Sequence, residues 1–418
     1  EHRARPEADA LHATGERPAR VRSILAAAVV AMAAIAAAWL AYELYRLIAK
    51  PVSIGPIAVQ RGGIDLELPH LMVNDWFAGL PVYTGPREGQ HPHPPASMAI
   101  LWPVYGGPSL ARATAVYLLV TLASLAWIVV VAVRESGAAF PSERALVALV
   151  PLATYPAGAT IGNGQTTVYA LAAALAALLL LRDRPPGRGR NLAVAALLLV
   201  AMGKPSLCAP FVLLALVLPG GARPVALLVA AYVALTLFAA SFQPLSLRDQ
   251  FGYFLAQASR VGALNGQTDV HALVAWLGVP SMMAAASAGA LVLLAWWLCR
   301  HRHADFWLLA GVTAIAARFW TYHRWYDDLL LVLPLVALFR IAKTDAGGQG
   351  RVAGALFALT LAFLLAPGGL YLLPAPWVHA YVGVQVFLWI AAAGCLAMAA
   401  RGDPGAAGRP PGAIAPAA

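Results

Sequence analysis

Charged residues are scarce in this chain of 418 residues: Asp, Glu, Lys and Arg together make up 11%, against 61% hydrophobic residues. A soluble domain carries about 25% charged and about 45–50% apolar residues, so the composition excludes an ordinary soluble globular protein. The mean hydropathy of +0.71 agrees with this exclusion. Because one transmembrane helix needs about 20 apolar residues, the chain is long enough for many crossings. The sequence predicts a polytopic membrane protein.

Cysteine is also rare: the three residues Cys208, Cys299 and Cys395 are far apart and lie in or beside apolar segments. Their spacing fits no metal site, so we expect them to pack as small hydrophobic residues. The sequence has no P-loop and no glycine-rich phosphate fingerprint. Its apolar runs are continuous rather than alternating, which argues against an outer-membrane barrel.

The net charge of +10 comes from 29 Lys and Arg against 19 Asp and Glu. In a soluble protein such a balance would suggest nucleic acid as a partner. Here the cations lie between apolar runs, where they orient a chain in the membrane. We therefore expect membrane lipids, and no nucleic acid, among the partners.

The apolar runs predict an all-α polytopic membrane protein with about 12 transmembrane helices. The predicted helices are 23–48, 109–133, 145–160, 165–181, 191–203, 206–218, 224–241, 281–299, 305–320, 327–342, 352–367 and 380–400. The first run is too long for the apolar region of a signal peptide, which favours a retained helix. The pairs 145–181 and 191–218 each allow a second interpretation, a helical hairpin that does not fully span.

The distribution of cations predicts the orientation. Nineteen of the 29 Lys and Arg fall on the side of the N-terminus, so the positive-inside rule makes both termini cytoplasmic. Residues 1–22 are expected to be a disordered cytoplasmic tail, 23–400 a single transmembrane domain, and 401–418 a second disordered tail. The longest outer loop, 51–107, contains short amphipathic stretches such as 66–77, which suit helices lying in the membrane interface.

Several titratable side chains in this outer loop could carry chemistry. Asp65 lies near its start, where a carboxylate can act as a general base on a hydroxyl. Glu67 and Asp75 compete for that role. His91 and His93 could bind a metal together with His70, but the intervening prolines favour loop structure, and we expect no metal. A second outer loop is expected at 242–280.

A third outer cluster covers 318–328, where cations, aromatic residues and carboxylates follow one another closely. The arginine side chain offers a fixed fork of donors to phosphate oxygens, and a protonated histidine can add a charge-assisted bond. The cluster therefore predicts a phosphate-bearing ligand at the outer membrane surface. The alternative is an aromatic belt with snorkelling arginines.

Two further features lie near turns between apolar helices. Lys204 precedes a proline at such a turn, and a lysine in this setting either snorkels outward or meets an anion. Residues 162–165, Gly-Asn-Gly-Gln, offer a flexible turn with side-chain amides on the same outer side.

In this order, these elements resemble glycosyltransferase family 87, within the C-type superfamily of integral membrane glycosyltransferases that use polyprenyl-phosphate sugars. The family pattern places a Gly fourteen residues and a Tyr eighteen residues after a loop Asp, and Asp65, Gly79 and Tyr83 fit that spacing. Further similar elements follow in chain order: His93-Pro94-Pro95, Gly164-Gln165, Lys204-Pro205, Asn265-Gly266-Gln267 and the aromatic segment 320–326. Two positions depart from the pattern, since His93 replaces a usual Tyr and Leu66 a common Phe.

The resemblance implies the C-type glycosyltransferase fold and an inverting hexosyl transfer, with mannose as the favoured sugar. A polyprenyl-phosphate sugar would be the donor, and a lipid or glycan the acceptor, at the periplasmic face of a bacterial inner membrane. Asp65 is implied to be the catalytic base, and no cofactor or metal is required. Nominated ligands of the donor phosphate are Lys204, Arg318, His323 and Arg324. Nominated substrate contacts are Tyr83, His93, Gln165, Gln267, Tyr322, Tyr326 and Asp327.

Two other classes compete with this interpretation. A transporter or lipid flippase should show inverted repeats and charges near the bilayer midplane on broken helices. The sequence instead concentrates its polar residues on one side and has no clear internal repeat. A structural assembly protein would use the outer cluster only as an aromatic belt.

Overall fold

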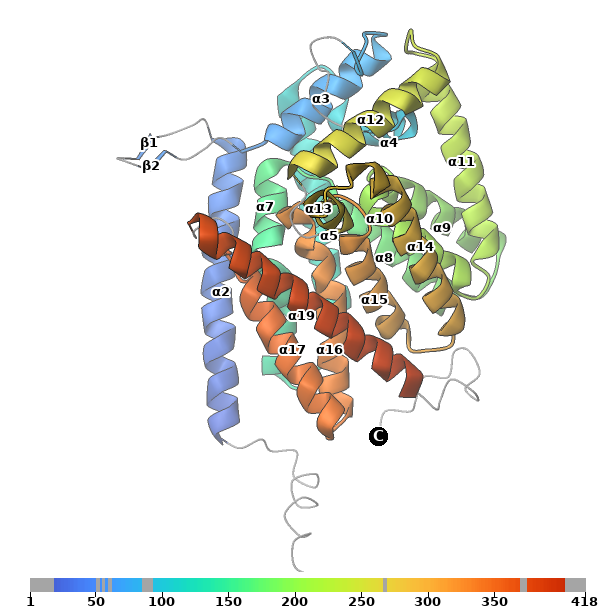
Figure 1. The fold of residues 1–418 in the computed structure, drawn as a ribbon. Helices are drawn as coiled ribbons and strands as arrows, with labels where there is room; N and C mark the ends of the chain where they lie inside the picture. Colours follow the sequence, from blue (N-terminus) through green and yellow to red (C-terminus); the bar gives the residue numbers. More distant parts are fainter. Residues whose placement is uncertain are drawn as a thin grey trace, which may run out of the picture.

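The computed structural model describes residues 19–49, 53–54, 57–58, 62–84, 93–265, 269–368 and 374–402, and these are almost entirely helical (Figure 1). The α-helices are α2 (Ala19–Ile48), α3 (Ile64–Phe77), α4 (Pro95–Tyr105), α5 (Leu110–Glu135), α6 (Pro141–Ala153), α7 (Tyr155–Asn163), α8 (Thr167–Asp183), α9 (Arg188–Ala201), α10 (Pro205–Val217), α11 (Ala222–Ala240), α12 (Leu247–Asn265), α13 (Val270–Trp276), α14 (Met283–Arg300), α15 (Phe306–Phe319), α16 (Val332–Thr344), α17 (Gly348–Leu364) and α19 (Ala375–Gly402). Two 3-10 helices, η1 (Pro280–Met282) and η2 (Trp325–Leu331), and two short antiparallel strands, β1 (Ser53–Ile54) and β2 (Ile57–Ala58), complete the described elements.

Five described helices are long and apolar enough to cross a membrane. They are Ser23–Ile48, Leu110–Glu135, Ala222–Ala240, Pro280–Arg300 and Trp377–Arg401. The pair α7 and α8 adds a sixth if it is counted as one span, although the two helices are bent by 117° at their junction. Three further apolar helices, α10, α15 and α17, have between 10 and 17 residues. The chain is therefore a helical membrane protein by the length and composition of its helices.

Each of the twelve predicted segments coincides with helix, but several boundaries differ. Helix α2 begins at Ala19, inside the predicted disordered tail, and α19 continues to Gly402. The predicted helix 145–160 is interrupted at Thr154, whose extended backbone separates α6 from α7. The predicted helix 327–342 begins as the 3-10 turn η2. The predicted second outer loop contains the 19-residue helix α12. The sequence did not predict this helix, because its composition is as polar as that of a loop.

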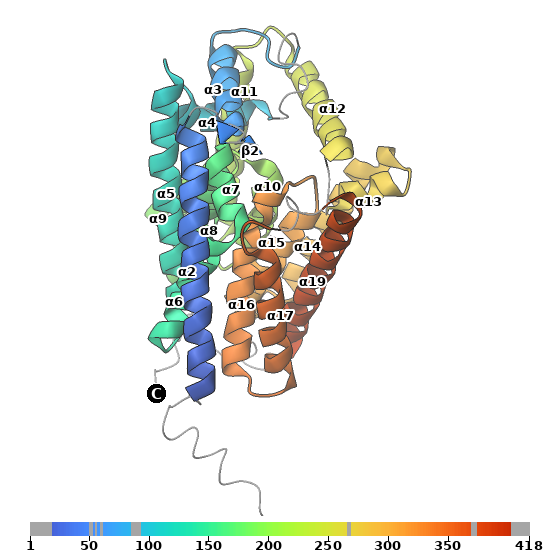
Figure 2. The same cartoon turned by 90° about the vertical axis from the view of Figure 1, so that its left-hand side faces the viewer.

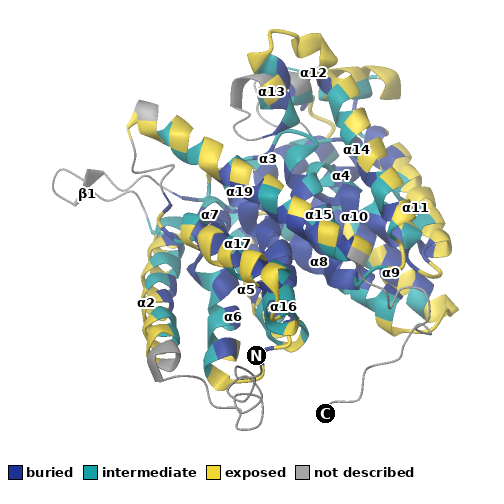
Figure 3. Cartoon of the chain, turned by 60° about the horizontal axis from the view of Figure 1, so that its bottom comes forward, coloured by how far each residue is buried: buried dark blue, intermediate teal, exposed yellow. Residues whose placement is uncertain are grey.

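The centre of the bundle is built around α8. This helix is rich in Ala and Leu on every face, and a helix that is hydrophobic all round is buried. Twelve of its residues are buried accordingly. Figure 3 shows α8 in dark blue at the centre, whereas α11 and α19 present exposed residues. Outward-facing apolar residues such as Leu237 and Phe387 suit a surface in contact with lipid tails.

One end of the bundle is closed by salt bridges. Glu135, at the end of α5, accepts two hydrogen bonds from Arg182 at 2.7 and 2.8 Å and one from Trp307 at 2.9 Å. Lys343 of α16 pairs with Glu143 of α6 at 2.8 Å. The start of α2 and the end of α19 lie toward this same lower end in Figures 1 and 2. The cations that the sequence assigned to the cytoplasmic side therefore gather at one end.

The opposite end is covered by α3, α4 and α12 (Figures 1 and 2). The predicted interfacial stretch 66–77 is part of helix α3, which buries Leu66, Met72 and Trp76 in a second hydrophobic cluster with α4. The Trp76 indole donates to the carbonyl of Ala239 on α11 at 2.7 Å. This helix is thus fixed on the bundle through its buried face.

The junction between α7 and α8 is held by tyrosines from neighbouring helices. The Tyr117 hydroxyl contacts the carbonyls of Thr160 and Gln165 at 2.9 and 3.1 Å, and the Tyr105 hydroxyl donates to the carbonyl of Gly164 at 3.1 Å. Carbonyls at a helix end have no partner within the helix, and burial without one would be costly. The amides of Gly164 and Gln165 also donate to the Thr160 carbonyl. The tyrosines add donors for it and for the carbonyls of Gly164 and Gln165, which stabilises the buried helix break.

We expect Gly164→Ala to destabilise the protein clearly more than Gly137→Ala. Both glycines have a positive φ, +83° and +73°, which costs a residue with a Cβ about 1–2 kcal/mol. At Gly164 the added Cβ would also lie 2.3 Å from the Cβ of Leu66, whereas nothing lies within 4 Å at Gly137. The measurement is the temperature at which half of the purified protein stays monodisperse. Equal losses for the two variants would contradict close packing at the break.

Candidate functional site

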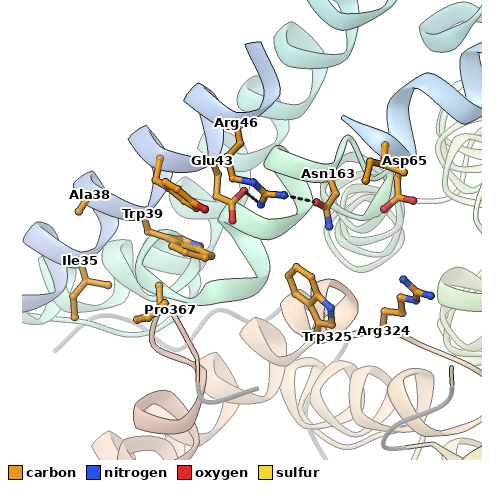
Figure 4. Close-up of a pocket in the computed structure, with 13 residues that line it drawn as sticks. Ile35, Ala38, Trp39, Glu43, Arg46, Asp65, Asn163, Arg324, Trp325 and Pro367 are labelled. Atoms are coloured by element: carbon orange, nitrogen blue, oxygen red, sulfur yellow. Dashed lines mark hydrogen bonds and ion pairs between the residues drawn. The ribbon is translucent and has the colours of Figure 1, made fainter. Parts of the chain in front are cut away.

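A cleft of about 860 Å³ lies between α2, the start of α3, the α7–α8 junction and the segment that leads into η2 (Figure 4). Its lining residues are Ile35, Ala38, Trp39, Tyr42, Glu43, Arg46, Ile64, Asp65, Asn163, Arg324, Trp325, Ala366 and Pro367. These residues come from five distant parts of the chain. The cleft combines apolar, aromatic and charged groups, which is typical of a site for an organic ligand.

The α2 wall of the cleft presents residues spaced by three or four positions, so they share one helix face. Within it Glu43 is 1% exposed and accepts a hydrogen bond from Arg46 Nη1 at 2.7 Å. Arg46 Nη2 lies 3.4 Å from the side-chain oxygen of Asn163. Trp39 donates to the carbonyl of Tyr155 at 3.2 Å, which fixes this face against α7.

Asp65 occupies the first turn of α3, and two backbone contacts set its place. The amide of Gly63 donates to the carbonyl of Gly162 at 2.8 Å, and Leu66 packs against Gly164. The start of α3 is therefore fixed to the helix break. Figure 4 shows Asp65 and Arg324 on facing sides of the cleft.

Arg324 is oriented from its own segment. Its Nε donates to the Tyr322 hydroxyl at 2.6 Å, and its backbone amide donates to Asp327 at 3.4 Å. Tyr322 and Asp327, two of the predicted substrate contacts, therefore bind Arg324 itself. Of the predicted site residues, Asp65 and Arg324 are the two that line the cleft.

Lys204 is paired with an anion, which is one of the two alternatives that the sequence predicts for it. Its Nζ lies 2.5 Å from Asp327 Oδ1, 3.0 Å from the Thr167 hydroxyl and 3.4 Å from Gln165 Oε1. The ammonium also lies 4.9 Å from the centre of the Tyr326 ring. Three predicted site residues therefore bind Lys204 rather than line the cleft. The carboxylate of Asp327 is thus the anion at Lys204, for which the sequence predicts a donor phosphate.

Arg318 is likewise paired inside the protein. Its Nε donates to Asp328, and both side chains are 1% exposed. The hydroxyl of Tyr155 also donates to Asp328, and Gln385 donates to that hydroxyl at 3.2 Å. This arrangement differs from the snorkelling arginine of an aromatic belt. It connects α15, η2, α7 and α19 through buried polar groups.

His323 is fully buried, at 0% exposure. Its Nδ1 lies 2.8 Å from the carbonyl of Thr321, and its backbone amide donates to Asp269 at 3.3 Å. Burial lowers the pKa of His323 to about 4; Asp327 opposes that change, whereas Arg318 and Lys204 reinforce it. The same burial raises the pKa of Asp269. At neutral pH the imidazole is uncharged, so it does not supply the cationic bond that the sequence suggested.

We expect the protein to lose stability between pH 6.5 and pH 4 through His323. The imidazole has a pKa of about 6.5 in the unfolded state and of about 4 in the folded state. The unfolded state therefore binds more protons in this interval. Stability present above pH 6.5 is lost as the pH falls, by up to about 3 kcal/mol. Unfolding curves at several pH values measure this loss. His323→Asn should flatten the profile, whereas the same change at the exposed His303 should not; identical profiles would contradict the assignment.

Other predicted residues lie outside the cleft. The Tyr83 hydroxyl donates to the backbone carbonyl of His93 at 2.5 Å, and the Tyr83 ring contacts Trp76 edge to face. This hydrogen bond joins the residues that follow α3 to those that precede α4. Gln267 and His91 lie outside the described residues. Among the described part of the chain, no group of three or more His, Cys, Asp or Glu could hold a metal ion.

Sequence reasoning missed three lining residues that the structure brings together: Glu43, Arg46 and Asn163. A signal for the first two was present, because they are charged residues near the end of an otherwise apolar run and stand three positions apart. Asn163 lay within the polar turn 162–165. Asp269 and Asp328 were also missed as partners of His323 and Arg318.

The fold and the cleft define the class as a helical membrane protein with a polar site on one side of its bundle. No protein-family model matches the chain, and neither a curated protein nor a solved structure matches it.

Proposed function

We propose that the chain is an inverting glycosyltransferase that moves a hexose from a polyprenyl-phosphate donor to a hydroxyl of a lipid or glycan acceptor. The proposal rests on the sequence resemblance to glycosyltransferase family 87 and on one observation. Asp65 and Arg324 face each other across a cleft whose wall continues along α2 to apolar residues such as Ile35 and Ala38. A carboxylate, a cation and an apolar surface suit a hydroxyl, a phosphate and a polyprenyl chain respectively.

Asp65 would act as the general base. Its carboxylate takes the proton of the acceptor hydroxyl while the hydroxyl oxygen attacks the anomeric carbon of the donor. The bond from that carbon to the phosphate oxygen breaks, and its electron pair leaves with polyprenyl phosphate. Attack opposite the leaving group inverts the anomeric carbon. Mannose is the sugar that the family resemblance favours.

Arg324 would offset the charge that develops on the leaving phosphate. Positioned cations act this way without reorganising at the moment of reaction. The Tyr322 hydroxyl at 2.6 Å orients the guanidinium toward this task. Lys204 and Arg318, which we also nominated, would act indirectly, because each is paired with a carboxylate of η2. Of the four nominated phosphate ligands, Arg324 is the one that lines the cleft, so it is the proposed phosphate contact.

The proposed setting is a bacterial inner membrane, with the cleft at the periplasmic face and both termini in the cytoplasm. The cations gathered at the far end of the bundle support this orientation under the positive-inside rule. The proposal keeps twelve crossings in the C-type fold. Besides the five long helices, seven shorter segments would cross: α6 with α7, α8, α9, α10, α15, η2 with α16, and α17.

The test is release of polyprenyl phosphate from a polyprenyl-phosphate hexose in proteoliposomes that contain the full chain and an extract of bacterial lipids. We expect release that depends on the protein and is matched by hexose in an extractable product. Donors that carry mannose, glucose or galactose are compared. Absence of release with all of them would overturn the proposal.

A transporter or lipid flippase is the second candidate, and one observation favours it. The α7–α8 pair is a broken helix, and the buried pair Lys204–Asp327 lies beside the break, as transporter sites do. A fluorescent polyprenyl-phosphate lipid separates the two functions. Movement of the intact lipid between leaflets without cleavage supports transport, and cleavage supports transfer.

A further inference from the structure

The cleft changes from apolar to polar along α2. Ile35 and Ala38 line one end together with Pro367, whereas Arg46 lines the other end near Asp65 (Figure 4). At a rise of 1.5 Å per residue, eleven residues of helix span about 16 Å. An amphiphile that lies along α2 would therefore place its chain beside Ile35 and its headgroup beside Arg46.

The polar end contains two cations that differ in their surroundings. Arg46 Nη1 is 2.7 Å from the carboxylate of Glu43, which is 1% exposed. Arg324 donates to the phenol of Tyr322 and faces Asp65 across the cleft. A guanidinium that is paired with a carboxylate has a small net attraction for a second anion, whereas its five N–H donors can bind hydroxyl oxygens as well as a carboxylate.

Asn163 completes this polar end. Its side-chain oxygen is 3.4 Å from Arg46 Nη2, and its amide N–H groups can serve as donors to a ligand. Trp39 and Trp325 line the cleft next to these groups. Amide and guanidinium donors beside aromatic rings suit the hydroxyls and the C–H faces of a neutral polyol.

We propose that Arg46 and Asn163, held by Glu43, form a subsite for the hydroxylated, uncharged headgroup of a lipid whose chain lies along α2. This inference rests on the proposed function, in which that lipid is the acceptor and presents one hydroxyl to Asp65. Arg46 and Asn163 contact the headgroup. Glu43 is a positioning residue, since it acts through Arg46.

The test is photo-cross-linking of the full chain in phosphatidylcholine nanodiscs. Three lipid probes carry a diazirine on the same acyl chain: hexosyl diacylglycerol, diacylglycerol and phosphatidic acid. We expect the hexosyl probe to label residues 35–46 at least fivefold more than either other probe. Equal labelling by phosphatidic acid would show an anion site, and uniform labelling of all lipid-facing helices would show no site; either result overturns the inference.

Substitutions identify the residues. Arg46→Gln and Asn163→Ala should each bring the labelling ratio of the hexosyl probe to diacylglycerol close to one. Tyr45→Phe, on α2 but outside the cleft, should leave it unchanged. Gel filtration checks that each variant is folded; if Arg46→Gln is not, Asn163→Ala decides. An unchanged ratio in a folded Asn163→Ala variant contradicts the subsite.

The subsite and the proposed reaction can fail separately. Selective labelling without transfer from any polyprenyl-phosphate hexose would retain the subsite and reject the glycosyltransferase. Transfer with unselective labelling would retain the glycosyltransferase and reject the subsite. Asp65→Asn should lower the rate of transfer at least about 100-fold and preserve labelling, because an amide still binds a hydroxyl but cannot take its proton.

Discussion

Asp65→Asn should lower the rate of hexosyl transfer by about 100-fold to 10,000-fold, the range that a general base contributes. Asparagine keeps the size of the side chain but cannot accept the acceptor proton. Substrate binding depends on the rest of the cleft, so kcat should fall and KM should change little. Initial rates of polyprenyl-phosphate release in proteoliposomes provide the measurement.

The matched control is Asp75→Asn on the same helix. Asp75 lies near the other end of α3 and does not line the cleft. Its variant should keep a rate within about twofold of the parent, as a substitution away from the chemistry does. An Asp65→Asn variant that kept more than half of the parent rate would remove Asp65 as the base.

The second large effect concerns stability. Asp328→Ala should destabilise the protein by about 3–5 kcal/mol, because it leaves the Arg318 guanidinium buried without its carboxylate. The surface pair Arg182–Asp183, with Asp183 50% exposed, offers a contrast: Asp183→Ala should cost about 0–1 kcal/mol. Unfolding of detergent-purified variants measures both.

A double variant separates pairing from packing. Arg318→Met combined with Asp328→Leu removes both charges, and such replacements are often neutral or stabilising. We expect it to recover most of the stability that Asp328→Ala loses. If the single variant costs no more than Asp183→Ala, the buried pair has no role in holding η2 to α15.

The helices could be predicted from the sequence because apolar runs long enough to be helical are separated by clear polar breaks. The local sequence named Asp65 only as one of three acids, with Glu67 and Asp75, and the family resemblance singled it out; of the three, Asp65 lines the cleft. Helix α12 could not be predicted, because its polar composition resembles that of a loop. The helix break at Gly164 was visible only as a flexible turn.

The pairing of charges could not be predicted from local sequence. Lys204 and Asp327 are 123 residues apart, so only the packing of α10 and η2 against the same two helices, α8 and α15, brings them together. The adjacent acids Asp327 and Asp328 bind different cations, on α10 and α15. In a 3-10 helix successive side chains point about 120° apart, which explains how one dipeptide serves two partners. The sequence shows the charges but not the direction in which each side chain points.

Only 11% of the most apolar stretch of helix α2 is buried, and the face that carries Glu43 and Arg46 forms a wall of the cleft. A ligand with a long apolar chain can therefore approach sideways through the lipid phase without passing through water. Under the proposed function, the reaction should follow two-dimensional kinetics. Diluting the substrate with inert lipid should slow turnover, whereas diluting the vesicles with buffer at a fixed substrate mole fraction should leave the rate per enzyme unchanged.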